Sequence, residues 1–83
     1  MNEEERQVKL ANLSYCREQG EKFYDEMYEV HSFGSAAVCY HDAKECFQAA
    51  IRLAEELGAL EEADSIRKRL EHITAVFRSQ FAQ

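Results

Sequence analysis

Residues 35–58 have the sequence SAAVCYHDAKECFQAAIRLAEELG. Small or apolar side chains recur in it at steps of three or four positions, at Ala36, Cys39, Ala43, Cys46, Ala50, Leu53 and Leu57. Such steps place side chains on one face of an α-helix, whereas a strand would alternate at every second residue. This face is widened by Tyr40, Phe47, Ile51 and Ala54. The stretch therefore predicts a helix with a broad apolar face.

The sequence on both sides shows the same periodicity. The C-terminal segment carries Leu60, Ala63, Ile66, Leu70, Ile73, Phe77 and Phe81, and the N-terminal segment carries Leu10, Leu13, Cys16, Gly20, Phe23, Met27 and Val30. Gly58 suits the left-handed residue that ends a helix, and Ser35 or Ser32 can cap the start of one. Short connections make successive helices antiparallel. We therefore predict an all-α, up-down-up three-helix bundle with helices at about 4–30, 35–57 and 60–81.

Gly20 leaves two possibilities open for the first helix. Glycine costs about 1 kcal/mol relative to alanine inside a helix, so a break within residues 16–21 would give four helices. Alternatively, the helix is continuous and the glycine allows a neighbouring helix to approach closely. The apolar face keeps its phase across Gly20. We therefore predict the continuous helix.

Length and composition limit the classes of protein that this chain can be. With 83 residues we expect a single domain over residues 1–83. The 16 acidic and 10 basic residues give a net charge of −6, which disfavours nucleic acid and anionic membrane surfaces as partners. No apolar run approaches the roughly 18 residues of a membrane span, and the acidic start is unlike a signal peptide. Three cysteines do not fit a secreted disulfide scaffold, so we expect a cytoplasmic location.

The width of the middle apolar face bears on the oligomeric state. A helix with only two neighbours leaves part of such a face uncovered. We therefore expect a homodimer to complete the bundle.

The middle helix resembles the second helix of a tetratricopeptide repeat. That pattern has a small residue, an aromatic residue four positions later, and then alanine and leucine at steps of three, here Ala43, Phe47, Ala50 and Leu53. The resemblance covers residues 43–63 and lacks the proline that closes such a repeat. It implies a helical hairpin that binds another protein in a groove.

Three cysteines and three histidines are the candidates for metal binding or catalysis: Cys16, Cys39, Cys46, His31, His41 and His72. Cys39 and Cys46 share a helix face but lie about 10 Å apart along the axis, too far for a disulfide. The sequence has neither a C-x2-C pair nor a Glu-x-x-His pair. We expect buried structural cysteines, no metal or other cofactor, and no enzymatic activity. The alternative hypothesis is a metal- or thiol-dependent bundle that uses Cys16, Cys39, Cys46 and His41.

Two groups of residues are candidates for binding a partner. Tyrosine combines a large contact area with a polar tip, and we expect Tyr24, Tyr28 and Tyr40 to be an exposed contact set. The turn between the second and third helices is acidic through Glu55, Glu56, Glu61 and Glu62. Two of these carboxylates stand at a helix C-terminus, where the helix dipole disfavours them, which points to a basic partner. The expected function is a small acidic interaction module or adaptor, and a structural homo-oligomer is a further alternative.

Overall fold

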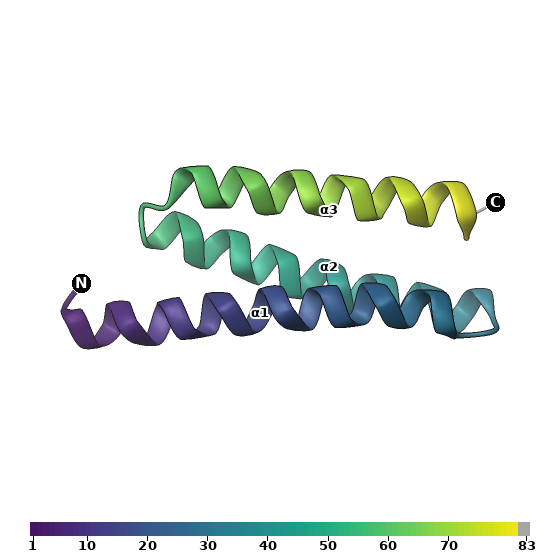
Figure 1. Ribbon diagram of the computed structural model, residues 1–83, viewed down its shortest axis with the longest axis horizontal. Coiled ribbons are helices and arrows are strands. Elements are labelled where there is room, and N and C mark those ends of the chain that lie inside the picture. Colours follow the sequence, from purple (N-terminus) through teal and green to yellow (C-terminus); the bar gives the residue numbers. More distant parts are fainter. Residues whose placement is uncertain (82–83) are drawn as a thin grey trace.

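The computed structural model describes residues 1–81 as three α-helices: α1 (Glu3–Glu29), α2 (Phe33–Glu56) and α3 (Leu60–Gln80). Successive helices run antiparallel, and α2 packs against both α1 and α3 (Figure 1). The bundle is elongated, with extents of 46 × 18 × 13 Å. The predicted fold class is confirmed, and the helix bounds lie within two residues of those expected.

The connections follow from local hydrogen bonding. The Ser32 hydroxyl accepts a hydrogen bond from the backbone N–H of Ser35 at 3.0 Å, so Ser32 and not Ser35 is the cap of α2. Gly58 adopts a φ of +73° after α2, as predicted. The N–H groups of Gly58 and Ala59 then donate to the carbonyls of Glu55 and Ala54, which satisfies two carbonyls at the helix end.

Alanine residues dominate the buried face of α2. Ala36, Ala43, Ala50 and Ala54 are at most 1% exposed, and such small side chains let the flanking helices approach closely. The centre of this face differs from the sequence-based expectation. Its large buried members are Tyr40 and Phe47, whereas Cys39, Cys46, Leu53 and Leu57 are half-buried at its margin. The reason is that α2 packs against both α1 and α3. Side chains that point to the space between these two helices are therefore more enclosed than those that face only one of them.

Gly20 lies in an unbroken α1, which confirms the continuous helix. A Cβ atom added at Gly20 would lie 2.8 Å from Cε2 and Cζ of Phe47. The absence of a side chain on α1 therefore makes room for the Phe47 ring of α2.

The seam between α1 and α3 is formed mainly by long side chains, because these two helices have far fewer close backbone approaches than either has with α2. Arg17 of α1 pairs with Glu62 of α3 at 2.8 Å. Arg69 of α3 donates two hydrogen bonds, of 2.7 and 2.8 Å, to the Glu21 carboxylate of α1. Polar contacts thus join α1 to α3, while the apolar core lies where both of these helices pack on α2. None of the helices in the described residues is long and apolar enough to cross a membrane.

Candidate functional site

An aromatic cluster occupies the end of the bundle where α1 connects to α2. Phe77 of α3 stacks on Tyr40 with ring centroids 4.3 Å apart, and also on Phe33 at 6.0 Å and on Phe81 at 6.2 Å. Tyr28 meets the edge of Phe81 at 5.7 Å. The sixth ring is Tyr24, which lies 5.4 Å from Tyr28. The three tyrosines predicted as a contact set therefore belong to one connected group, here called the aromatic cluster.

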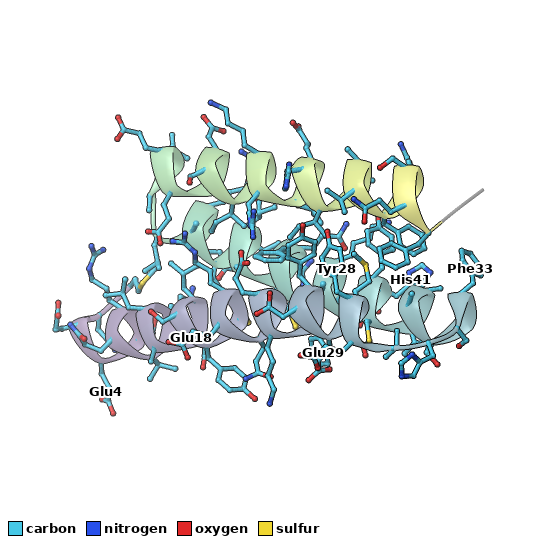
Figure 2. The ribbon with its side chains drawn as sticks, turned by 45° about the vertical axis from the view of Figure 1, so that its right-hand side comes forward. Glu4, Glu18, Tyr28, Glu29, Phe33 and His41 are labelled. Carbon is cyan, nitrogen blue, oxygen red and sulfur yellow. The ribbon has the colours of Figure 1, made fainter. Side chains whose placement is uncertain are left out.

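Exposure differs strongly within the cluster. Phe33 is 58% exposed and Tyr28 is 49% exposed, and Figure 2 shows Phe33 at the extreme end of the molecule, opposite the end that carries Glu4. Tyr40 is only 8% exposed. The prediction that Tyr40 is exposed is therefore wrong, because Phe77 covers its ring and its hydroxyl bonds to Thr74 Oγ1 at 3.0 Å. The surface of the cluster is formed by Phe33 and Tyr28, next to a hollow of about 250 Å³ that is lined by Val30, His31, Ser32, Phe33, Gln80 and Phe81.

Tyr24 is held in place by contacts on both sides. Its hydroxyl lies 3.1 Å from that of Tyr28, and the Arg69 guanidinium lies over its ring at 5.1 Å. The hydrogen bond with Tyr28, followed by burial, raises the pKa of Tyr24 to about 12 from 10.0. The neutral phenol is thus the form that the folded protein favours.

Removing the Tyr28 hydroxyl tests this network. In Tyr28→Phe we expect the pKa of Tyr24 to move down toward 10, because the largest cause of the shift is lost. A folded-state pKa above the unfolded value gives stability that is fully present below pH 10 and is lost as the pH rises toward 12. The variant should therefore lose less stability over that interval than the wild type. Ultraviolet titration of tyrosinate and urea unfolding at several pH values measure both quantities, with Tyr15→Phe as the control.

The acidic turn lies at the opposite end of the bundle from the aromatic cluster (Figure 1). Most of its predicted binding carboxylates already have cationic partners within the chain. Glu55 pairs with Arg67, Glu56 with Lys9 at 3.3 Å, and Glu62 with Arg17 at 2.8 Å. Glu61 is exposed and has no ion pair within residues 1–81. The unfavourable position of Glu55 and Glu56 at a helix C-terminus is thus compensated inside the molecule.

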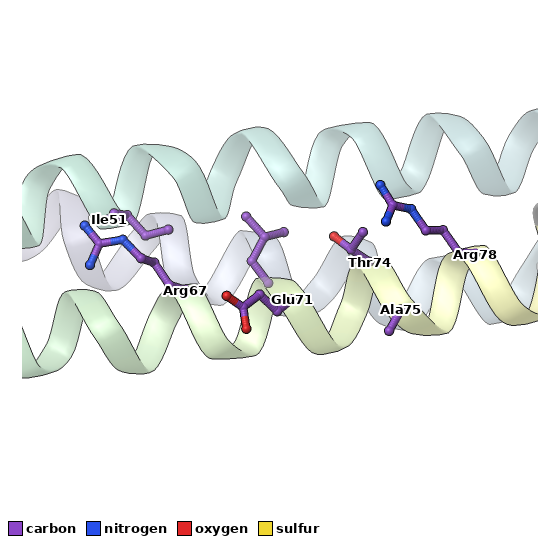
Figure 3. Close-up of a pocket in the computed structure, with 7 residues that line it drawn as sticks. Ile51, Arg67, Glu71, Thr74, Ala75 and Arg78 are labelled. Carbon is purple, nitrogen blue, oxygen red and sulfur yellow. The ribbon is translucent and has the colours of Figure 1, made fainter.

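A shallow groove of about 480 Å³ runs between α2 and α3, and it is here called the α2–α3 groove. It is lined by Ile51, Arg67, Leu70, Glu71, Thr74, Ala75 and Arg78 (Figure 3). The two arginine side chains extend from α3 toward α2 at its two ends. The groove borders the aromatic cluster, because Thr74 bonds to Tyr40 and Arg78 directly follows Phe77.

The cysteines and histidines do not converge. Cys16, Cys39 and Cys46 carry free thiols and are half-buried, whereas full burial was expected. Burial and nearby carboxylates raise the pKa of the Cys39 thiol, and burial followed by Cys16 and nearby carboxylates raises that of Cys46, which disfavours their thiolates. Residues 1–81 contain no group of three or more His, Cys, Asp or Glu side chains placed to hold a metal ion. His31, His41 and His72 are exposed.

Sequence reasoning did not select Phe33, Phe77 and Phe81 as site residues. The periodicity places Phe77 and Phe81 on an apolar face, and the expected helix bounds leave Phe33 in the connection between the first two helices. Two features of the sequence could have indicated them: the four-residue spacing of Phe77 and Phe81, and an aromatic side chain directly after the helix-capping Ser32.

Comparison of the chain with protein-family models, curated proteins and solved structures found no match.

Proposed function

We propose that this protein is a non-enzymatic protein–protein interaction module, and that its aromatic cluster is the docking surface. The observation that carries the proposal is the pairing of two half-exposed aromatic rings, Phe33 and Tyr28, with buried or half-buried rings that fix their position. An aromatic side chain that is already ordered loses little conformational entropy when a partner covers it. Such residues commonly dominate the binding energy of interfaces.

The geometry supports a rigid platform. Phe33 is backed by Phe77, which is itself 9% exposed and stacked on Tyr40. The hollow beside Phe33 and Phe81 offers a concave place for one partner side chain. Together these features resemble the centre of an interface, where an anchor fills a pocket and surrounding contacts exclude water.

A pair of matched variants tests the proposal. We expect Phe33→Ala to weaken binding of partner proteins about tenfold, since truncating an anchor typically costs more than about 1 kcal/mol. Tyr15→Ala is the control, because Tyr15 is 62% exposed and makes no aromatic contact within residues 1–81. A photo-crosslinking residue at position 33, or at position 15 for comparison, first captures partner proteins in cells. The affinity of a captured partner for purified Phe33→Ala and Tyr15→Ala is then measured, after circular dichroism has shown that each variant is folded.

The cross-linked products distinguish the alternatives. A heterologous protein captured from position 33 and lost in Tyr28→Ala supports the proposal. Equal capture from positions 33 and 15 contradicts it. Capture of copies of this chain alone would instead support a structural homo-oligomer.

A further inference from the structure

The C-terminal part of α3 differs in charge from the rest of this acidic protein. Residues 66–81 contain four basic side chains, Arg67, Lys68, Arg69 and Arg78, and one acidic side chain, Glu71. Arg69 is directed to α1 by its two hydrogen bonds with Glu21. Of the remaining three, Lys68 and Arg78 form no ion pair within residues 1–81, so this part of α3 carries unpaired positive charge in a chain with a net charge of −6.

Two of these cations frame the α2–α3 groove. Arg67 and Arg78 are eleven positions apart, which corresponds to three helical turns, or about 16 Å. Between them the lining is largely apolar, with Ile51, Leu70 and Ala75. A groove with an apolar lining and a guanidinium group near each end is complementary to an amphipathic helix that carries carboxylates.

The two arginines are not equivalent. Arg67 already binds Asp64 and Glu55, so a partner carboxylate would have to compete for it. Arg78 is exposed and forms no ion pair within residues 1–81. Arg78 is therefore the main cation available to a partner, and the Glu71 carboxylate, about two helical turns away in the same lining, opposes an acidic ligand.

We propose that the α2–α3 groove binds an acidic amphipathic helix of the partner, with apolar side chains on Ile51 and Leu70 and a carboxylate on Arg78. This inference rests on the proposed function, because it names the class of partner. Phe77 links the two surfaces: it precedes Arg78 in α3 and stacks on Phe33. A helix seated in the groove with its end at Arg78 would point toward the end of the bundle that carries the aromatic cluster. A basic helix would place its cations against Arg78, and the carboxylates at the other end, Glu55 and Asp64, are already bound to Arg67.

The test uses three synthetic peptides of about 16 residues that differ only in charge. Each carries leucines at the spacing of one helical face, and the flanking positions are all glutamate, all glutamine or all lysine. Binding to the full chain is followed by amide chemical shifts in NMR. We expect the glutamate peptide to bind at least tenfold more tightly than the lysine peptide, to shift the signals of Leu70, Thr74 and Ala75, and to weaken with added salt.

Two variants should change the affinity for the glutamate peptide in opposite directions, and a third is the control. Arg78→Gln should lower the affinity for the glutamate peptide about threefold to tenfold, whereas Glu71→Gln should raise that affinity about twofold to threefold. Lys68→Gln is the matched control, because it removes the same charge from α3 outside the groove lining and should have a smaller effect than Arg78→Gln.

The inference is overturned if the lysine peptide binds as well as the glutamate peptide, if no peptide binds, or if the shifts map outside the groove. It is also overturned if Arg78→Gln and Lys68→Gln behave alike. Any of these results would reject the acidic-helix inference. The proposed function would be kept as long as cross-linking from position 33 still captures a partner. Loss of that capture rejects the docking surface itself.

Discussion

Phe47→Ala is expected to lower the free energy of unfolding by about 3–5 kcal/mol, the usual cost of truncating a fully buried phenylalanine. Phe47 is 1% exposed and is the largest fully enclosed side chain in the core. It lies against Gly20 of α1, where no side chain is present to fill the cavity. The loss is comparable to the whole stability of a small domain, so the variant should be largely unfolded.

Urea unfolding followed by circular dichroism measures this loss. Phe47→Leu provides a variant that stays folded, with an expected loss of about 1–1.5 kcal/mol because most of the volume is kept. Gln48→Ala is the control at the neighbouring exposed position, with an expected change within about 0.5 kcal/mol. A loss below about 1 kcal/mol for Phe47→Ala would show that this ring does not lie in the core.

Gly20→Ala is expected to destabilise the protein by about 1–3 kcal/mol, although alanine favours helix by about 1 kcal/mol over glycine. The new Cβ would lie 2.8 Å from the Phe47 ring, and that ring is enclosed on all sides and has little space in which to move. Steric overlap therefore outweighs helix propensity at this position.

Gly34→Ala is the matched control, because a Cβ at Gly34 meets no atom within 4 Å and the residue also lies in a helix. We expect that variant to be as stable as the wild type or up to about 1 kcal/mol more stable. The double variant Gly20→Ala/Phe47→Leu should be more stable than the sum of its single effects predicts, since the smaller side chain relieves the overlap. Greater stability of Gly20→Ala alone would contradict the close contact between α1 and α2.

The two ends of the bundle differ in chemistry, and this difference shapes the functional proposal. At the α2–α3 turn, Glu55, Glu56 and Glu62 are paired with cations of the same chain. At the other end, Phe33 and Tyr28 expose aromatic surface next to a groove framed by arginines. Paired surface charges contribute little to binding a partner, whereas exposed aromatic side chains lose contact with water when a partner covers them. The proposed docking surface is therefore the aromatic end.

The sequence by itself determined the number, order and approximate bounds of the helices. Periodic apolar residues mark each helix, and the turn after α2 requires the positive φ of Gly58. These features depend on residues within a few positions of one another, so local hydrogen bonding and side-chain spacing are sufficient to predict them. The continuity of α1 across Gly20 was predicted on the same basis, from the unbroken phase of its apolar face.

The tertiary structure decided which side of each apolar face is enclosed and which distant residues meet. Tyr40 is buried because Phe77, 37 positions later, covers it. Glu62 is neutralised by Arg17, and Glu56 by Lys9. The periodicity of a single helix shows which residues share a face, but it carries no information on the rotation of that helix against its neighbours. The gathering of six aromatic rings at one end, and the groove between Arg67 and Arg78, arise from that rotation.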